Sequence, residues 1–406
     1  MVFRYSLILL CLFLLNNSII KAQNNLSGIT SWAYQLQDIN IQEIADDERF
    51  ELVVIDYSSD GTDENKFSQS EISIIKNSGK KVISYLSIGE AETYRYYWQN
   101  KWDADKNGVP DASAPEWLGE ENPDWEGNYE VKYWYPEWQE IVFSYIDKII
   151  AQGFDGIYLD LVDNYYYWME INPVEPKADS LMVEFIASIR EYVDSKTEGR
   201  FFIIPQNGEF IIYEPNVNDD FYETYFSSID AIGIEDVFFY GDKDENNSYN
   251  PDMERLNTLQ EFLDQNKPVF SVEYLTREDL IDKYTEEAAF NQFIPFISIR
   301  DLSILGTPIV TEVESVEASA GQIEFVIWPN PFNAQTTIEY ELEADAKVNV
   351  SVFDCMGQKI SILANETQRK GKHSVGFDAK DLATGTYYIR LLKNNESGVK
   401  KIVVLK

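Results

Sequence analysis

The chain has little of the chemistry on which many enzymes depend, because it contains only one histidine, His373, and two cysteines, Cys11 and Cys355. Residues 23–303 contain neither residue type. Catalysis by Ser-His-Asp or Cys-His groups is therefore excluded there, as are zinc sites built on histidine or cysteine. No phosphate-binding P-loop and no dinucleotide-binding glycine motif is present. Acid–base chemistry in this region must therefore use carboxylates, supported by tyrosine and lysine.

Long apolar runs are also scarce, and the one at the start of the chain is short. Arg4 precedes an apolar run from about Leu7 to Leu15, and a short polar stretch follows. This pattern is typical of a secretory signal peptide and is too short for a membrane span. We therefore expect residues 1–22 to be removed and the mature protein to be exported, soluble and without a transmembrane segment. One cysteine then remains, so no intrachain disulfide is expected.

Basic residues are fewer than acidic ones. The chain has 33 Lys and Arg and 70 Asp and Glu, which gives a formal net charge of −37. Such a surface repels nucleic acid and anionic lipid headgroups, so neither is an expected partner. Solubility is the simpler explanation of the charge, and an acidic cleft that attracts a cationic polymer is the alternative. We expect the protein to be monomeric.

Eight short runs rich in Val, Ile, Phe and Tyr alternate with helical stretches between Gly28 and Asp301. Near-continuous apolar character is typical of strands in a buried parallel sheet. The pattern predicts an α/β fold, a (β/α)8 TIM barrel over residues 23–303. A doubly wound open sheet is the alternative, although no glycine-rich loop follows the first run. The predicted strands lie within 29–37, 50–58, 80–90, 154–163, 200–208, 230–239, 267–275 and 294–302.

The connection from about Ala91 to Pro136 is long and rich in aromatic residues, so we interpret it as a wall of a substrate cleft. It contains the sequence DADKNGVPD, in which oxygen-bearing side chains follow the spacing of a calcium loop. The last ligand position of such a loop is Ala114 instead of Glu, so an acidic turn fits better and a bound Ca²⁺ is the alternative. The candidate ligands are Asp103, Asp105, Asn107 and Asp111.

Seven of the eight predicted strands end in an acidic or amide residue, at the edge where barrel active sites lie. A buried acid is costly unless it has a partner or a role. Each acid taken singly is explained by a helix cap or an ion pair, but the repeated pattern is harder to explain that way. Two carboxylates are what cleavage of a glycosidic bond requires. The strand-end residues are Asp56, Glu90, Glu92, Asp160, Asp163, Gln206, Asn207, Glu235, Asp236, Glu273, Tyr274, Arg300 and Asp301.

Four motifs together resemble the barrel family of endo-α-1,4-polygalactosaminidases, glycoside hydrolase family 114. They are YLSIGEAETYRYYW (85–98), APEWLGEENPDWEGNYEVKYW (114–134), GFDGIYLDLVDNYYYW (153–168) and IIPQNGE (203–209). The resemblance implies an endo-acting, retaining glycosidase for α-1,4-linked galactosamine polymers, with no cofactor. It also implies a catalytic Asp on the fourth strand and a catalytic Glu on the sixth, which correspond here to Asp160 and Glu235.

In the mechanism that this pair implies, Asp160 attacks the anomeric carbon while Glu235 protonates the departing oxygen and then activates water. A retaining reaction needs the carboxyls about 5 Å apart, whereas about 7–9 Å indicates inversion. Glu235 should have a raised pKa because it must keep its proton beside another acid. Candidates for binding sugar polar groups are Asp56, Glu90, Gln206, Asn207 and Glu273, and candidates for stacking are Tyr34, Tyr158, Tyr166 and Trp168.

After a linker at 304–324, residues 325–406 form short alternating strands that predict a small immunoglobulin-like β-sandwich. WPNPFN (328–333), FDCMGQKI (353–360), LATGTYYIRL (382–391) and the terminal KKIVVLK resemble the type A C-terminal sorting domain of the type IX secretion system of Bacteroidetes. This resemblance implies passage through the periplasm and the outer membrane, with the secretion machinery and its sortase as partners. The mature protein would be secreted or attached to the cell surface. A carbohydrate-binding module is the alternative.

Two other functions compete with a hydrolase that acts on a polysaccharide. The first is a non-catalytic surface glycan-binding barrel in which both acids are relics, and the second is an adhesin. Both Asp160 and Glu235 are present, so the sequence gives no sign of decay. Carboxylates at the strand ends would have no purpose in an adhesin.

Overall fold

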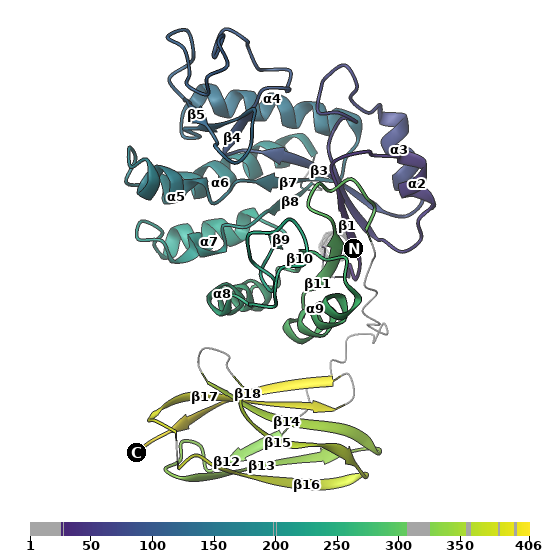
Figure 1. The fold of residues 1–406 in the computed structure, drawn as a ribbon, viewed down its shortest axis with the longest axis vertical. Helices are drawn as coiled ribbons and strands as arrows, with labels where there is room; N and C mark the ends of the chain where they lie inside the picture. Colours follow the sequence, from purple (N-terminus) through teal and green to yellow (C-terminus); the bar gives the residue numbers. More distant parts are fainter. Residues whose placement is uncertain are drawn as a thin grey trace, which may run out of the picture. The chain divides into compact units, whose positions relative to one another are not determined.

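The computed structural model describes residues 26, 28–197, 199, 201–306, 325–354, 359–380, 382–393 and 396–406. The chain divides into two compact units, with the boundary between Glu312 and Val313 (Figure 1). The predicted signal peptide, residues 1–22, lies outside the described residues, and so does the predicted linker from residue 307 onward.

The first unit is an α/β fold, and each of the eight predicted runs contains a strand. Five of these strands pair in parallel in the order β1-β2-β3-β7-β8, and three pair in parallel in the order β11-β10-β9. Nearly every residue in them is buried, as expected for sheets covered on both faces. The strands are β1 (Trp32–Gln35), β2 (Leu52–Ile55), β3 (Lys81–Ser87), β7 (Gly156–Asp160), β8 (Phe202–Pro205), β9 (Ile232–Glu235), β10 (Val269–Tyr274) and β11 (Ile294–Ser298).

Contacts between the two parallel sheets occur at both of their edges. Gln206, just after β8, forms a parallel bridge with Gly233 of β9. At the other edge, the Leu36 amide donates to the Leu302 carbonyl at 3.0 Å. The Trp32 ring lies 5.3 Å from the Phe270 ring and 6.2 Å from the Tyr158 ring, so side chains of both sheets share one core.

Helices follow most of the strands and surround them (Figure 1). Their ends carry the expected signals: Ser68 and Glu71 form a capping box on α3, and Gly153 ends α4 in the left-handed conformation. Within the described residues, no helix is both long and apolar enough to cross a membrane. The helices are α2 (Ile41–Asp46), α3 (Gln69–Asn77), α4 (Pro136–Gln152), α5 (Asn164–Tyr166), η1 (Tyr167–Ile171), α6 (Ala178–Thr197), η2 (Glu209–Tyr213), α7 (Asp219–Ser228), α8 (Met253–Asp264) and α9 (Glu278–Asn291).

The long connection before α4 is more ordered than a loop. It contains an antiparallel sheet in the order β4-β6-β5, formed by β4 (Glu90–Glu92), β5 (Leu118–Glu121) and β6 (Asn128–Val131). Its tryptophans form a small core, because the Trp117 ring lies 5.3 Å from Trp102 and 4.9 Å from Trp138 of α4. Packing of aromatic rings therefore gives this connection a regular structure that the sequence did not predict.

The second unit is all β and consists of two antiparallel sheets, β12-β13-β16 and β15-β14-β17-β18. Alternate residues of β13 are buried, as in a strand with one face on a core. The short alternating strands predicted for residues 325–406 are present. The strands are β12 (Phe325–Trp328), β13 (Gln335–Leu342), β14 (Ala346–Asp354), β15 (Lys359–Gln368), β16 (Gly371–Asp378), β17 (Gly385–Lys393) and β18 (Glu396–Val404).

Candidate active site

Asp160 and Glu235 are the last residues of β7 and β9, and they extend from the same inner face of the strands. Two residues earlier, Tyr158 and Gly233 lie against each other, since a Cβ on Gly233 would lie 1.9 Å from the Tyr158 hydroxyl. Alternate residues of a strand point to the same side, so the two acids face each other above this contact. Both are half-buried and keep access to solvent.

Two of the described residues donate hydrogen bonds to the Asp160 carboxyl. Tyr85 donates to Oδ2 at 2.6 Å, and the Leu161 amide donates to Oδ1 at 2.8 Å. Burial raises the pKa of Asp160 to about 8, the Tyr85 hydrogen bond opposes this shift, and the nearby charge of Glu235 adds to it. The two carboxyls are therefore close enough to influence each other's protonation.

The Glu235 carboxyl is held from both sides. Tyr274 of β10 donates to Oε1 at 2.7 Å, and the Gln206 side-chain amide donates to Oε2. Burial raises the pKa of Glu235, while the Tyr274 hydrogen bond and the charge of Arg300 oppose the shift. The raised pKa expected for this residue is confirmed in direction.

Arg300, which follows β11, supports the Glu235 side of the site. Its guanidinium contacts both carboxylate oxygens of Asp236, at 2.6 and 3.0 Å. The guanidinium carbon also lies 3.8 Å from the centre of the Tyr274 ring. A cation over the ring face is attracted by the ring quadrupole, so Arg300 fixes the tyrosine that holds Glu235.

The backbone turns sharply directly after three of the strand-end residues. Leu161, Asn207 and Asp236 have φ angles of 59°, 55° and 54°, in the left-handed region. Residues other than glycine adopt this region at a cost of about 1–3 kcal/mol, so the surrounding structure must enforce it. The turn ends each strand and leaves Asp160, Gln206 and Glu235 at the edge of the sheets.

Gln206 connects the pair to a predicted stacking residue. Its side-chain oxygen accepts from the Tyr34 hydroxyl at 3.2 Å, while its nitrogen donates to Glu235. Tyr34 and Tyr158 are buried, with ring centres 5.1 Å apart. Both rings therefore lie beneath the acids, and the prediction that they stack on a sugar is corrected because neither face is accessible. The Asn207 side-chain oxygen accepts from Arg255 at 3.1 Å and from the Glu235 amide at 3.3 Å.

Asp56 and Glu90, both predicted to bind sugar, lie in buried networks next to the pair. Asp56 forms an ion pair of 2.8 Å with Arg95, which also pairs with Glu92 at 2.6 Å. Burial is the main cause that raises the pKa of Asp56, to about 6. Glu90 accepts from the side-chain amides of Asn122 and Asn128 at 2.6 and 3.1 Å. Their oxygens are thus engaged by protein donors.

Glu273 and Trp168 require a correction, because neither is accessible to a sugar in this structure. Glu273 is fully buried and accepts from the Phe238 amide at 2.7 Å. It alternates along β10 with Tyr274, which faces Glu235, so Glu273 points to the opposite side of the strand. Trp168 is 1% exposed and donates from its indole nitrogen to the Val131 carbonyl at 2.9 Å. Both residues have packing roles.

The candidate calcium ligands form a turn closed by the chain's own donors. Asp103 accepts from the amides of Asn107 and Gly108 at 3.2 and 2.9 Å, and also from the Tyr129 hydroxyl. Asp111 accepts from the Ala104 amide at 2.8 Å, and Asp105 accepts from the Asn107 side chain at 3.1 Å. Among the described residues, no group of three or more His, Cys, Asp or Glu side chains is arranged to hold a metal ion.

Comparisons with known proteins show the family to which the chain belongs. The model of glycoside-hydrolase family GH114 matches residues 16–318, and a secretion system C-terminal sorting domain matches residues 326–405. An uncharacterized protein of Methanocaldococcus jannaschii is 41% identical over 299 residues, which covers 71% of this chain and 81% of that protein.

Two solved structures share the fold of the first unit. A variant of the glycoside hydrolase domain of PelA from Pseudomonas aeruginosa is 16% identical, with a TM-score of 0.51, and the match covers 69% of this chain and 99% of that one. Ega3 of Aspergillus fumigatus in complex with galactosamine is 19% identical, with a TM-score of 0.50, covering 69% and 95%. At these identities the likeness concerns the fold.

Proposed function

Because this chain belongs to glycoside-hydrolase family GH114, we propose that it cleaves α-1,4-linked galactosamine or N-acetylgalactosamine polymers, with Asp160 and Glu235 as the reacting carboxylates. The observation that carries this proposal is the pairing of two half-buried acids at the ends of β7 and β9. Residues 23–303 contain no histidine or cysteine that would serve another hydrolytic chemistry.

The proposed reaction retains the configuration of the sugar and proceeds in two steps. In the first, a carboxylate oxygen of Asp160 attacks the anomeric carbon while Glu235 gives its proton to the departing glycosidic oxygen. In the second, the Glu235 carboxylate takes a proton from water, and that water displaces Asp160 from the anomeric carbon. Tyr85 and Tyr274 hold the two carboxyls in position throughout.

Asp160 must lose its proton to act as a nucleophile, although burial raises its pKa to about 8 in the free protein. A protonated amino sugar supplies a positive charge beside the carboxyl and lowers its pKa. A deacetylated galactosamine polymer thus promotes ionisation of the group that attacks it. The net charge of −37 acts in the same direction, because it attracts a cationic chain. The galactosamine bound to Ega3 agrees with this substrate class.

The architecture that supports this chemistry is proposed to be a closed (β/α)8 barrel over residues 23–303. The β8–β9 bridge and the Leu36–Leu302 hydrogen bond support closure, because they join the two parallel sheets at both edges. We propose that Gln206 and Asn207 orient Glu235 from the strand ends and that Tyr34 holds Gln206 in place. The sheet β4-β6-β5 is proposed as a wall of the substrate cleft.

The C-terminal unit is a secretion sorting domain, so the chain is exported and becomes secreted or attached to the cell surface. We propose that its two sheets form an immunoglobulin-like sandwich that the type IX machinery recognises. We also propose that a sortase removes it after translocation and that the residues before it, 304–324, serve as a linker.

The test is a product analysis on α-1,4-linked polymers of galactosamine, N-acetylgalactosamine and a partly acetylated mixture. Shorter oligomers with new reducing ends are expected from at least the deacetylated polymer. Binding of that polymer should weaken as salt is added, since screening reduces the attraction between opposite charges. Absence of cleavage on all three polymers would contradict the proposed substrate class.

A further inference from the structure

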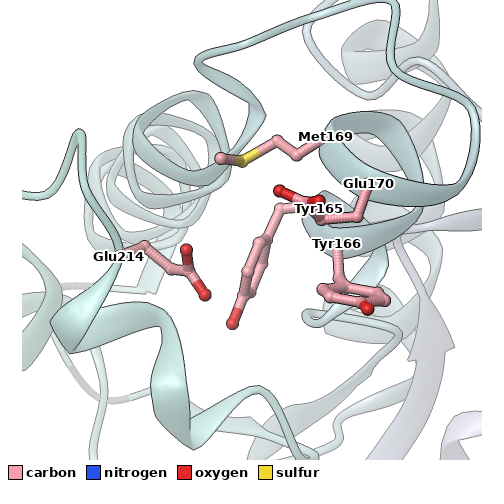
Figure 2. Close-up of a pocket in the computed structure, with 5 residues that line it drawn as sticks. All are labelled: Tyr165, Tyr166, Met169, Glu170 and Glu214. Atoms are coloured by element: carbon pink, nitrogen blue, oxygen red, sulfur yellow. The ribbon is translucent and has the colours of Figure 1, made fainter.

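A pocket opens in the segments that follow β7 and β8. Figure 2 shows its five lining side chains: Tyr165, Tyr166, Met169, Glu170 and Glu214. Its volume is about 110 Å³, which is room for several water molecules or for the polar groups of one sugar unit. Neither catalytic carboxyl lines this pocket, so it is separate from the Asp160–Glu235 pair.

The pocket carries negative charge that the protein does not neutralise. Among the ion pairs of the described residues, none includes Glu170 or Glu214. Glu214 is half-buried and accepts a hydrogen bond from Tyr165. Burial is the main cause that raises the pKa of Glu214, and the charges of Asp179 and Glu170 raise it further. A bound cation would relieve this repulsion.

An exposed aromatic ring borders the pocket. The Tyr166 side chain is 55% exposed, and Tyr213, next to Glu214 in sequence, is 61% exposed. An aromatic ring at the rim of a pocket can stack on a sugar and attract a cation. In the described part of the first unit, every exposed aromatic residue lies in a segment that follows the carboxyl end of a strand: Tyr94, Trp125, Tyr166, Tyr213, Tyr240 and Tyr249.

We propose that this pocket is a distal subsite that binds a protonated amino-sugar unit of the polymer being cleaved. The proposal rests on the proposed function and specifies it further. The ammonium group would lie between Glu170 and Glu214, and the sugar ring would lie against Tyr166. An N-acetyl group removes the positive charge, so acetylated units would bind there more weakly.

The position of the pocket relative to the strands explains how one chain could reach both places. Tyr165 and Tyr166 belong to α5, which begins four residues after Asp160. Glu214 directly follows η2, in the connection that begins with Gln206. A polymer lying across the ends of β7 and β8 would therefore pass from the acids toward the pocket. Binding away from the cleaved bond favours long chains and cleavage within them.

The experiment compares Glu214→Gln and Tyr166→Ala with the wild-type full chain. Hydrolysis is measured on short and long deacetylated α-1,4-galactosamine oligomers and on N-acetylated oligomers of equal length. For Glu214→Gln, the KM for long deacetylated oligomers should rise about tenfold more than the KM for short ones, the loss expected for one charge contact. The difference should vanish on acetylated oligomers. Glu191→Gln, on the exposed side of α6, is the matched control.

Two outcomes are distinguishable. If the wild type cleaves the oligomers and both pocket variants keep its preference for long deacetylated chains, the subsite proposal is overturned and the proposed function stands. If the wild type neither cleaves nor binds these oligomers, the proposed substrate class fails, and the subsite fails with it. Unchanged thermal unfolding midpoints of the variants ensure that a loss of preference reports on binding.

Discussion

The Tyr85 hydroxyl donates a hydrogen bond of 2.6 Å to Oδ2 of Asp160. This bond joins neighbouring strands, because Tyr85 lies on β3 and Asp160 ends β7. It favours the ionised carboxylate and so limits how far burial raises the pKa of Asp160. The hydroxyl therefore stabilises the charged form that the nucleophile needs.

Replacing Tyr85 with phenylalanine should raise the pKa of Asp160 beyond its value of about 8. Less of the carboxyl is then ionised near neutral pH, so kcat/KM should fall by about tenfold or more, and the acidic limb of its pH profile should move upward. The pH dependence of kcat/KM measures both effects. Tyr145→Phe is the matched control, since the Tyr145 hydroxyl is buried without a hydrogen-bond partner. An unchanged acidic limb in Tyr85→Phe would contradict this role.

Replacing Arg300 should change the pKa of the Glu235 carboxyl. The charge of Arg300 lowers the pKa of Glu235, whereas Asp236, which Arg300 neutralises, raises it. Arg300→Met should therefore raise the pKa of Glu235 and move the basic limb of the kcat/KM profile to higher pH. Arg300→Lys keeps the charge but loses the two-point contact, so its shift should be smaller. Equal pH profiles for wild type and Arg300→Met would show that the ion pair of Arg300 and Asp236 does not influence the pKa of Glu235.

Gly233 should tolerate no side chain, because the Tyr158 ring occupies the space where a Cβ would lie. Overpacking of a well-packed core costs about 1–3 kcal/mol, and this contact is severe, so Gly233→Ala should lose about 3 kcal/mol of unfolding free energy. Urea unfolding followed by tryptophan fluorescence gives the value. Gly28→Ala is the control, since nothing lies within 4 Å of its Cβ position. Equal losses of unfolding free energy in Gly233→Ala and Gly28→Ala would contradict the close contact between Gly233 and Tyr158.

The stability of the protein should depend on the titration of Asp160. Its pKa is raised from 3.8 to about 8, so the folded state holds this proton over a pH range in which the unfolded chain has lost it. This group therefore makes folding less favourable as pH rises from about 4 to about 8. Asp160→Asn has no such proton to lose. Thermal unfolding should show the variant more stable than wild type at about pH 8, with the advantage shrinking toward pH 4. An advantage independent of pH would contradict the assigned pKa.

The strands and the two acids were predictable because they depend on local patterns. A buried parallel strand must be apolar over most of its length, so Asp160 in GIYLD and Glu235 in IGIE are conspicuous. The partners of these acids were harder to predict. Tyr85 and Tyr274 reach them from neighbouring strands, and the sequence alone does not give the register that brings them together.

Glu273 shows where residue type misleads. It is an acid at a strand end, like Asp160, but its neighbour Tyr274 occupies the inner face and leaves Glu273 on the outer one. Two-residue alternation along the strand shows that only one of Glu273 and Tyr274 can face the site, but it does not show which one.

The sheet β4-β6-β5 was not predicted for another reason. Its strands are three or four residues long, and aromatic packing across the connection stabilises them.

Whether Asp160 and Glu235 are the catalytic carboxylates is decided by the release of reducing ends from the deacetylated polymer by Asp160→Asn and Glu235→Gln. Each variant should lose about 10²–10⁴-fold or more in kcat while keeping a wild-type unfolding midpoint or a higher one. The matched controls Glu191→Gln and Asp264→Asn, on the exposed surfaces of α6 and α8, should keep wild-type rates. Wild-type cleavage by either Asp160→Asn or Glu235→Gln would contradict the assignment of this pair as the catalytic carboxylates.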